Sequence, residues 1–353
     1  MGTALPEQVE SERTPSEIEQ YDYELPPESI AQSAAEPRDS SRLLVLERDS
    51  GKMSHRTFSE LAGILRAQDL LVINDTRVMS CRLSARREPS GGRVELLLLR
   101  EVEAGRWESL AKPAKRLTKG SRLAVEELTA TVEECLDDGI RLLSFDGEVR
   151  PLMKRVGELP LPPYIGRPGG SVGERYQTIF ADKEASAAAP TAGLHFSEAL
   201  FRDLESSGVG VARVTLEIGW DTFRPLRADH LDDHRMHSER YEVSDDAAAR
   251  IEECRQRGGR IVAVGTTTTR LLESVADAGG QISPGVGSTD LFIRPGYRFK
   301  AVDAMITNFH LPRTTLLMLV AAFAGQEPMM DAYREAILRK YRFYSLGDAM
   351  LVH

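Results

Sequence analysis

Short apolar segments alternate with helical segments over the second half of this chain, and this alternation restricts the fold more than any other feature. The segments 210–219 and 260–265 are apolar enough to be buried strands. Ser197 and Ser244 stand where helices would begin, and a glycine stands where each helix would end. Apolar strands that alternate with helices are typical of a mostly parallel sheet covered by helices, so we expect an α/β fold.

The segment from 68 to 148 interrupts this pattern with six short β-type runs and no helix. Many short strands in succession point to a small antiparallel barrel or sandwich, and we expect an inserted β-barrel domain at 68–148. The large α/β domain then consists of 19–67 and 149–353, with a helix at 58–67 that opens with a capping box. Residues 1–18 are expected to form a disordered acidic leader.

The composition fits a folded protein that is neither secreted nor inserted in a membrane. Hydrophobic residues make up 41% and charged residues 28% of the chain, which is ordinary for a globular protein. The longest apolar run, Leu316–Ala324, is too short to span a bilayer, and the acidic N-terminus has no apolar signal-peptide core. Cys81, Cys135 and Cys254 have neither disulfide-framework nor zinc-knuckle spacing, so we expect a cytoplasmic protein.

Charge is distributed unevenly along the chain. The formal net charge is −9, but residues 1–24 contribute −6 and residues 77–122 contribute +7. Within the basic segment, the run "KPAKRLTKGSR" holds five cations: Lys112, Lys115, Arg116, Lys119 and Arg122. This density suits contact with the phosphates of a nucleic acid, and a solvated loop is the alternative.

Polar residues follow several of the expected strands. Ligands of open α/β sheets bind beyond the carboxyl ends of the strands, so residues at these positions are candidates for a site. The candidates are Asp75 and Arg77 after "LLVIN", Glu217, Asp221 and Thr222 after "RVTL", Thr266 and Thr267 after "RIVAVG", and Asn308 and His310 in "ITNFH". We expect these side chains to line one shared cavity.

The stretch "AAAPTAGLHF" at 187–196 places small residues in front of His195 and an aromatic ring. Ala, Pro, Thr and Gly let the backbone approach a ligand closely, which makes Thr191, Gly193 and Phe196 candidate ligand contacts. The same residues also form ordinary turns, and a packed core histidine is an equally good interpretation of His195.

Two further motifs suggest ligand chemistry. In "VGTTTTRLLES" a strand feeds the first turn of a helix, whose N–H groups attract anions, although capping by Thr is an alternative. The motif lacks the lysine of a Walker sequence and the glycines of a dinucleotide site. The run "HLDDHRMHSE" holds His230, His234, His237 and Glu239, and histidines four apart on a helix could bind zinc, which would make the protein a zinc-dependent hydrolase.

Long runs of this chain match one enzyme family in order, from about residue 21 to the end. They include "YDYELPPESIAQ", "DLLVINDTRV", "LPLPPYIGRP", "AAAPTAGLHF", "VAVGTTTTRLLES" and "FIRPGYRFKAVDAMITNFHLPRTTLLMLVAAFAG". With these runs the chain resembles the S-adenosylmethionine:tRNA ribosyltransferase-isomerase family of queuosine biosynthesis. One departure is "LEIGWDTF", where Glu217 takes the place of the family's usual histidine and Asp221 that of a glycine.

The resemblance implies an enzyme that transfers and isomerises the ribosyl part of S-adenosylmethionine onto 7-aminomethyl-7-deazaguanine at the wobble position of a tRNA. Adenine and methionine leave, and epoxyqueuosine is formed. S-adenosylmethionine is a consumed co-substrate, so neither a metal nor a redox cofactor is required. The expected partner is tRNA, which the five cations of the basic run would help to bind. The protein is expected to be a monomer.

The resemblance also suggests roles for the candidates. A sulfonium acidifies the neighbouring carbon, so a base can remove that proton before adenine leaves. The expected catalytic residues are His195 and His310 as base and acid, and Glu217 and Asp75 as carboxylates that hold the ribose or the sulfonium. The expected substrate-binding residues are Arg77, Thr191, Gly193, Phe196, Asp221, Thr222, Thr266, Thr267, Arg270 and Asn308, with Tyr164 and Phe196 stacking on a base.

Overall fold

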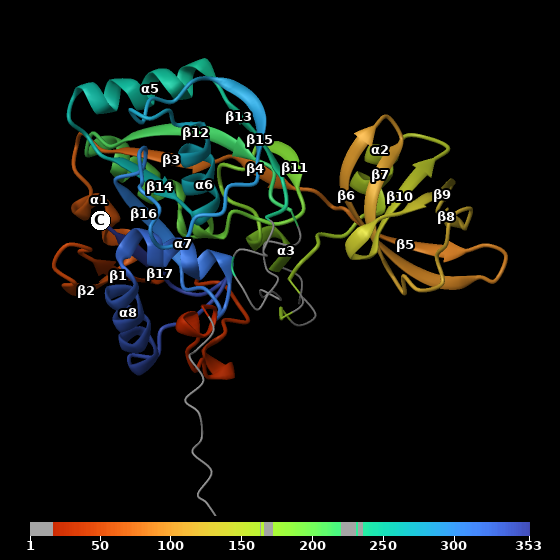
Figure 1. Ribbon diagram of the computed structural model, residues 1–353, viewed down its shortest axis with the longest axis horizontal. Coiled ribbons are helices and arrows are strands. Elements are labelled where there is room, and N and C mark those ends of the chain that lie inside the picture. The colour runs from red at the N-terminus through yellow and green to blue at the C-terminus, as the bar shows by residue number, and fades with distance from the viewer. Residues whose placement is uncertain (1–16, 163, 166–171, 220–230, 232–235) are drawn as a thin grey trace, which may run out of the picture.

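A nine-stranded sheet forms the centre of the larger part of the molecule, and a closed barrel lies beside it (Figure 1). The structure is a computed structural model and describes residues 17–162, 164–165, 172–219, 231 and 236–353. The expected class, a large α/β domain with an inserted antiparallel barrel, is confirmed.

The strands of the sheet lie in the order β15-β13-β12-β3-β14-β16-β17-β1-β2. Their bounds are β1 Arg42–Leu46, β2 Met53–Thr57, β3 Leu70–Asn74, β12 Gly210–Leu216, β13 Glu239–Val243, β14 Ile261–Val264, β15 Gly285–Thr289, β16 Ala304–Asn308 and β17 Ala349–Val352. The pairs β12–β3, β3–β14, β14–β16 and β17–β1 are parallel, and the other neighbours are antiparallel. The expectation of a mostly parallel sheet therefore holds for only four of the eight neighbouring pairs, three of them at the centre. The link 47–52 between β1 and β2, for example, is too short for anything but an antiparallel pair.

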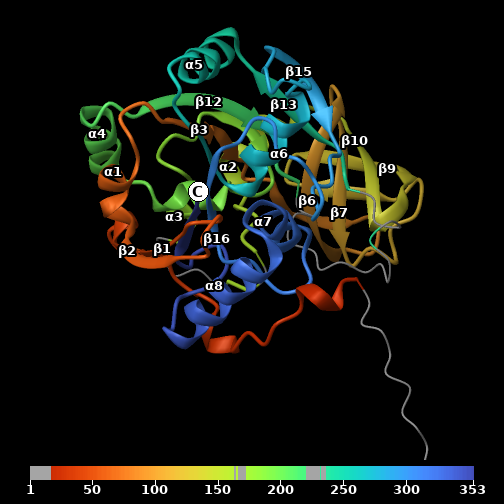
Figure 2. The same ribbon diagram turned by 60° about the vertical axis from the view of Figure 1, so that its left-hand side comes forward.

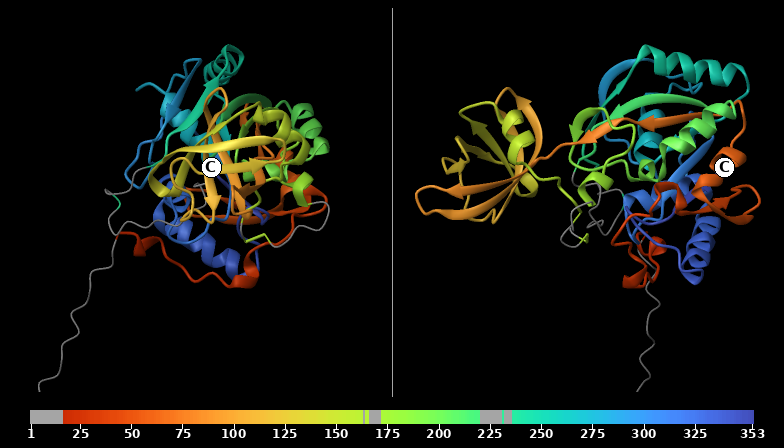
Figure 3. Two further views of the ribbon diagram at one scale, coloured as in Figure 1. Left: turned by 90° about the vertical axis from the view of Figure 1, so that its right-hand side faces the viewer. Right: turned by 180° about the vertical axis from the view of Figure 1, so that it is seen from behind.

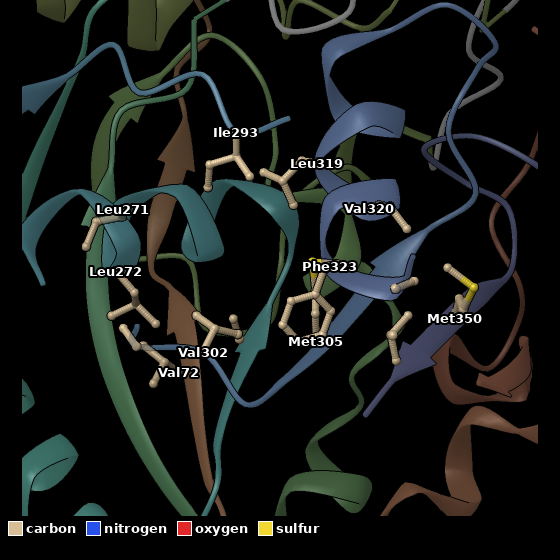
Figure 4. Packing of buried hydrophobic residues seen from close by; sticks show 14 of the residues in the cluster. Val72, Leu271, Leu272, Ile293, Val302, Met305, Leu319, Val320, Phe323 and Met350 are labelled. Carbon is tan, nitrogen blue, oxygen red and sulfur yellow. The ribbon is translucent and has the colours of Figure 1, made fainter. Parts of the chain in front are cut away.

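Helices cover both faces of the sheet (Figure 2). One face carries α5 Asp245–Gln256, α6 Thr266–Val275, α7 Thr315–Ala324 and α8 Gln326–Leu338, and the other carries α1 Leu61–Ile64 and α4 Glu198–Ser206. In β3, Leu70 and Val72 face the first set and Leu71 and Ile73 the second, and all four are buried. A strand covered on both sides has no polar face, which explains the uninterrupted apolar run in the sequence. Figure 4 shows Val72 in this core beside α6.

Local helix signals are confirmed at three positions, including the capping box of Thr57 and Glu60, although the helix that follows this box is shorter than expected. The N-cap hydroxyls of Ser197 and Ser244 each accept a backbone N–H, at 3.1 and 3.2 Å. The helix expected at 58–67 was wrong in length, because α1 ends at Ile64. Asp69 accepts the N–H of Arg66 at 2.8 Å, and this contact turns the chain towards β3. Short 3-10 helices occupy Glu19–Tyr21, Pro27–Ser29, Arg38–Ser40, Phe58–Glu60, Asp137–Gly139 and Thr191–His195.

The barrel closes through antiparallel pairs in the order β10-β7-β6-β5-β8-β9. Its strands are β5 Arg82–Arg87, β6 Gly92–Glu103, β7 Arg106–Lys112, β8 Arg122–Val125, β9 Leu128–Cys135 and β10 Ile140–Phe145, followed by α2 Val149–Val156. The barrel therefore begins later than residue 68, because β3 belongs to the large sheet. The strand β4 Thr76–Val78 pairs with β11 Lys183–Ser186, also outside the barrel.

Two chain segments run between the barrel and the sheet (Figure 3). They are tied together by paired hydrogen bonds between Arg82 and Glu158, at 3.0 and 2.9 Å. Gly157 is required for this close approach, because a Cβ there would lie 2.0 Å from the carbonyl oxygen of Ser80.

At the N-terminus, Ile18 is buried in the large core, so the predicted leader extends too far, and residues 1–16 lie outside the described part. Among the residues that the structure describes, no helix is long and apolar enough to cross a membrane. The short helix α3 spans Val172–Arg175.

Candidate functional site

A cavity lies where β14 and β16 end, beside the 3-10 helix Thr191–His195. Because β14 and β16 are parallel neighbours, their carboxyl ends meet at one edge of the sheet. The walls of this central cavity are the segments 189–192, 265–267 and 344–345, together with Ile218, Thr307, Asn308, His310 and Leu316. The structure thus brings together five of the predicted residues: Thr191, Thr266, Thr267, Asn308 and His310.

The turn from β14 into α6 gives the cavity a wall of donors. Gly265 has φ +95° and ψ 153°, a conformation open almost only to glycine, and it aims the start of α6 at the cavity. The hydroxyls of Thr268 and Thr269 donate to carbonyls four residues earlier, at 2.7 and 3.1 Å. Thr266 and Thr267 line the cavity instead. Their hydroxyls, with the unpaired N–H groups of the first helical turn, suit a carboxylate or another anion.

His195 lies behind the cavity residue Asn308. Its Nδ1 lies 2.8 Å from the hydroxyl of Ser41, and its Nε2 lies 3.1 Å from the side-chain nitrogen of Asn308. The ring stacks on Phe58 with centroids 5.0 Å apart. Burial lowers the pKa of His195 to about 4, so the imidazole is neutral near pH 7. His195 is not part of the cavity lining.

His310, in contrast, lines the cavity and keeps one nitrogen unused. Its Nε2 lies 3.4 Å from the hydroxyl of Thr307, and its buried Nδ1 has no hydrogen-bond partner in the described part of the chain. Burial lowers the pKa of His310 to about 3. The backbone at His310 is held firmly, because its N–H donates to the hydroxyl of Tyr333 at 3.0 Å and its carbonyl accepts from the hydroxyl of Tyr23. The backbone of His310 is therefore fixed, and its imidazole is neutral near pH 7.

The two predicted catalytic carboxylates do not line the central cavity. Asp75 accepts the hydroxyl of Thr215 at 2.7 Å, and burial raises its pKa although this hydrogen bond opposes the change. Glu217 lies in a cleft between the two domains, opposite Arg100 and Glu108 of the barrel. Burial also raises the pKa of Glu217. The expected single cavity is therefore divided.

The interdomain cleft nevertheless adjoins the central cavity. Ile218, directly after Glu217, lines both of them. Arg77 lies in a separate cleft beside the linkers, where its guanidinium donates to the carbonyl of Ala181 at 2.5 Å. Arg270 lines an apolar cavity that shares Thr266 and Thr267 with the central one, and it pairs with Glu239.

Three predicted ligand contacts are packing residues in this structure. Phe196 is fully buried among Phe58, Phe180 and Phe201, so it has no face for a base. A Cβ on Gly193 would lie 2.6 Å from the ring of Phe180, so this glycine serves close packing. Tyr164 packs on the cavity residue Tyr344, with ring centroids 4.3 Å apart.

Several predicted residues fall outside the described part of the chain: Asp221, Thr222, His230 and His234. Among the described residues, including His237 and Glu239, there is no group of three metal-ligating side chains. Ser41 was missed by the sequence analysis. A single serine carries no pattern, and only the fold brings it to His195.

The five cations of the basic run are all exposed, and the loop that holds most of them lies at the far end of the barrel. Arg87, at the end of β5, pairs with Gly92 and Leu123, whereas Arg82 at its start adjoins the linkers. Six residues of strand place this end about 17 Å from the linkers. Arg122 pairs with Glu88 at 3.1 Å. The run Lys112, Lys115, Arg116 and Lys119 thus forms a basic tip on the barrel.

Comparisons with known proteins agree with one another. A family model described as "Queuosine biosynthesis protein" matches residues 18–352. The S-adenosylmethionine:tRNA ribosyltransferase-isomerase of Symbiobacterium thermophilum is 52% identical over 339 residues, 95% of this chain and 99% of that protein. The protein of the same name from Moorella thermoacetica is 51% identical over 340 residues, with the same coverage. A crystal structure of S-adenosylmethionine tRNA ribosyltransferase from Thermotoga maritima, 40% identical, aligns with a TM-score of 0.55 and covers 95% of this chain and 100% of that one. None of them supports a zinc-dependent hydrolase.

Proposed function

We infer that this chain, which belongs to the queuosine biosynthesis protein family, is an S-adenosylmethionine:tRNA ribosyltransferase-isomerase. It transfers and isomerises the ribosyl moiety of S-adenosylmethionine onto 7-aminomethyl-7-deazaguanine at the tRNA wobble position, with release of adenine and methionine. The observation that carries this conclusion is the 52% identity with a protein of that name over 95% of the chain. The predicted activity and enzyme class are confirmed at this level.

For the site, we propose that S-adenosylmethionine occupies the central cavity. The start of α6, with the hydroxyls of Thr266 and Thr267, would take the methionine carboxylate, because backbone N–H groups and hydroxyls there are donors. Thr191 and Asn308 on the opposite wall would contact the ribosyl or adenine part. The co-substrate is consumed, and this proposal needs no further cofactor.

His310 is the side chain best placed for proton transfer. If Nε2–H donates to Thr307, then Nδ1 carries a lone pair and can take the proton from the carbon beside the sulfonium. The ring then becomes an imidazolium. Because burial disfavours that charged form, the imidazolium readily returns its proton to the adenine nitrogen that leaves the ribose. The same proton is moved twice, so His310 ends neutral, as it began. The positive charge that the sulfonium loses when it becomes a thioether leaves as the proton that the attacking amine gives up.

The tRNA would bind across both domains. The basic tip on the barrel would contact phosphates, while the wobble base enters the interdomain cleft next to the central cavity. A distance of about 17 Å between tip and linkers suits an extended RNA and not a small ligand. We further propose that the enzyme acts as a monomer in the cytoplasm, where tRNA is modified.

The experiment is an assay of adenine release from S-adenosylmethionine, with tRNA that carries 7-aminomethyl-7-deazaguanine. Release should require that base, and the same tRNA with guanine should give none. His310→Ala should lower kcat by about 10²- to 10⁴-fold, the usual contribution of acid–base catalysis. His55→Ala is the matched control, because His55 contacts Tyr341 and Glu335 away from the cavity. Adenine release without the modified tRNA would contradict the assigned function, and near-normal turnover of His310→Ala would remove only His310 from the mechanism.

A further inference from the structure

We propose that Ser41 and His195 form a positioning pair that fixes the orientation of the Asn308 side chain in the wall of the central cavity. The proposal rests on the proposed function, because it assigns this cavity to the co-substrate. It gives His195 a role other than proton transfer and adds Ser41 to the residues on which the reaction depends.

The hydrogen bonds of Asn308 define its orientation. The side-chain nitrogen lies 3.3 Å from the carbonyl oxygen of Tyr344, which can only accept, so the nitrogen donates there. The same nitrogen lies 3.1 Å from Nε2 of His195, so Nε2 also accepts and carries no proton. A neutral imidazole then holds its proton on Nδ1, which donates to the hydroxyl oxygen of Ser41 at 2.8 Å. The Ser41 hydroxyl accepts this proton and so stabilises the tautomer whose Nε2 accepts from Asn308.

This orientation presents acceptor oxygens to the cavity. The hydroxyl of Thr191 donates to Oδ1 of Asn308 at 3.0 Å, so both oxygens keep lone pairs for a ligand. Both residues line the cavity. If the amide turned over, its nitrogen would replace the oxygen and this wall would offer a donor. Two acceptor oxygens suit the hydrogen-bond donors of the co-substrate, which are the ribose hydroxyls and the amino group of adenine.

The surroundings of His195 fit a fixed support. Ser41, His195 and Asn308 are only 1%, 4% and 3% exposed. The imidazole is stacked on Phe58, and both of its nitrogens are occupied. His195 does not line the cavity, so it would make no direct contact with a ligand there. It acts on the ligand only through Asn308.

Two substitutions separate the two nitrogens of the ring. The amide group of glutamine reaches about as far as Nε2, whereas that of asparagine reaches only about as far as Nδ1. His195→Gln therefore keeps an acceptor for Asn308, and His195→Asn keeps only the contact with Ser41. For adenine release, we expect kcat/KM for S-adenosylmethionine to stay within about 3-fold of wild type in His195→Gln and to fall about 10- to 100-fold in His195→Asn, the range expected when a contact group is misplaced.

Two other results would overturn the proposal. If His195 transferred a proton, both variants would lose about 10²- to 10⁴-fold in kcat and glutamine would not rescue. If His195 only filled the core, the two variants would differ in melting temperature but share a normal kcat. If His195→Asn does not fold, Ser41→Ala is tested in its place. Ser41→Ala should lower kcat/KM in the wild-type background. It should not lower kcat/KM further in His195→Gln, because glutamine has no Nδ1 that Ser41 could hold.

The tautomer gives a readout that does not depend on activity. In protein labelled with ¹⁵N-histidine, the signals of His195 are those that disappear in His195→Gln. We expect the Nδ1–H tautomer in the wild type and a shift towards Nε2–H in Ser41→Ala. An Nε2–H tautomer in the wild type refutes the positioning pair even if the enzyme is active. A failure of the wild type to release adenine refutes the assigned function and leaves the tautomer result intact.

Discussion

Gly265→Ala is the substitution for which the structure predicts both a stability cost and a functional cost. Gly265 has φ +95° and ψ 153°, a region that is essentially restricted to glycine. An added Cβ would meet Thr267 and Ala192 at 3.5 and 3.6 Å, which are ordinary contacts, so the backbone term dominates. We expect a loss of about 1 to 3 kcal/mol of folding free energy. Relaxation of the backbone strain at Gly265 would also move Thr266 and Thr267. On the proposed binding mode, this movement would weaken binding of the methionine carboxylate of S-adenosylmethionine by about 10-fold or more.

A second glycine provides an unusually close control. Gly325 has φ +85° and ψ 141°, also stands at the start of a helix, and would place its Cβ 3.4 Å from Pro328. It does not line the central cavity. In urea or thermal unfolding, Gly265→Ala and Gly325→Ala should lose similar stability. In the adenine-release assay, only Gly265→Ala should raise KM for S-adenosylmethionine. A loss of less than about 0.5 kcal/mol in Gly265→Ala, or an equal rise in KM in the two variants, would contradict the role assigned to Gly265.

Two further predictions concern charge. Asp69 pairs with Arg260 at 2.6 Å, and although burial alone would raise the pKa of Asp69, hydrogen bonds from Arg260 and from the N–H of Arg66 lower it. The ionised Asp69 therefore contributes stability above the unfolded pKa of about 4, and this contribution is lost as the pH falls below it. Asp69→Asn should thus lower the free energy of unfolding more at pH 7 than at pH 3. The exposed Asp49→Asn is the control. On the basic tip, reversal of Lys115, Arg116 and Lys119 to Glu should weaken tRNA binding and reduce the salt dependence of log Kd by about 3, whereas an unchanged slope would mark a solvated loop.

The parts of the fold that could be predicted are those encoded over a few residues. The caps at Ser197 and Ser244 depend on a hydroxyl and an N–H three residues later, so the local sequence contains the whole interaction. Strand β2, Met53–Thr57, was missed because its polar residues are only half-buried and show no alternation. The direction of the outer strands was missed for a related reason. It depends on where the chain returns to the sheet, which no short window shows.

The site shows the same limit more clearly. Sequence position after a strand correctly brought Thr266, Thr267 and His310 to one cavity, because parallel strands share an edge. It could not say towards which cavity a side chain points, and so Glu217 was grouped with His310 although it faces the barrel. The sequence left the role of His195 ambiguous. A histidine that lines the cavity and a histidine that packs behind the lining residues have the same neighbours in sequence. Only the contacts with Ser41 and Asn308 distinguish them.

The charge of the central cavity bears on the chemistry. None of the described residues that line it carries a charge, and its one ionisable imidazole is neutral. A sulfonium bound there would lose water without gaining a counter-ion from these residues, which is unfavourable for the substrate. In the step that cleaves the carbon–sulfur bond, the bonding electrons stay on sulfur and the sulfonium becomes the uncharged thioether of methionine, so the positive charge diminishes on the way to the transition state of that step. An uncharged cavity wall therefore raises the free energy of the bound sulfonium more than that of the transition state. A carboxylate beside the sulfur would instead stabilise the bound sulfonium more than the transition state. Glu217 and Asp75 do not line this cavity, so we do not expect either carboxylate to stabilise a sulfonium bound there.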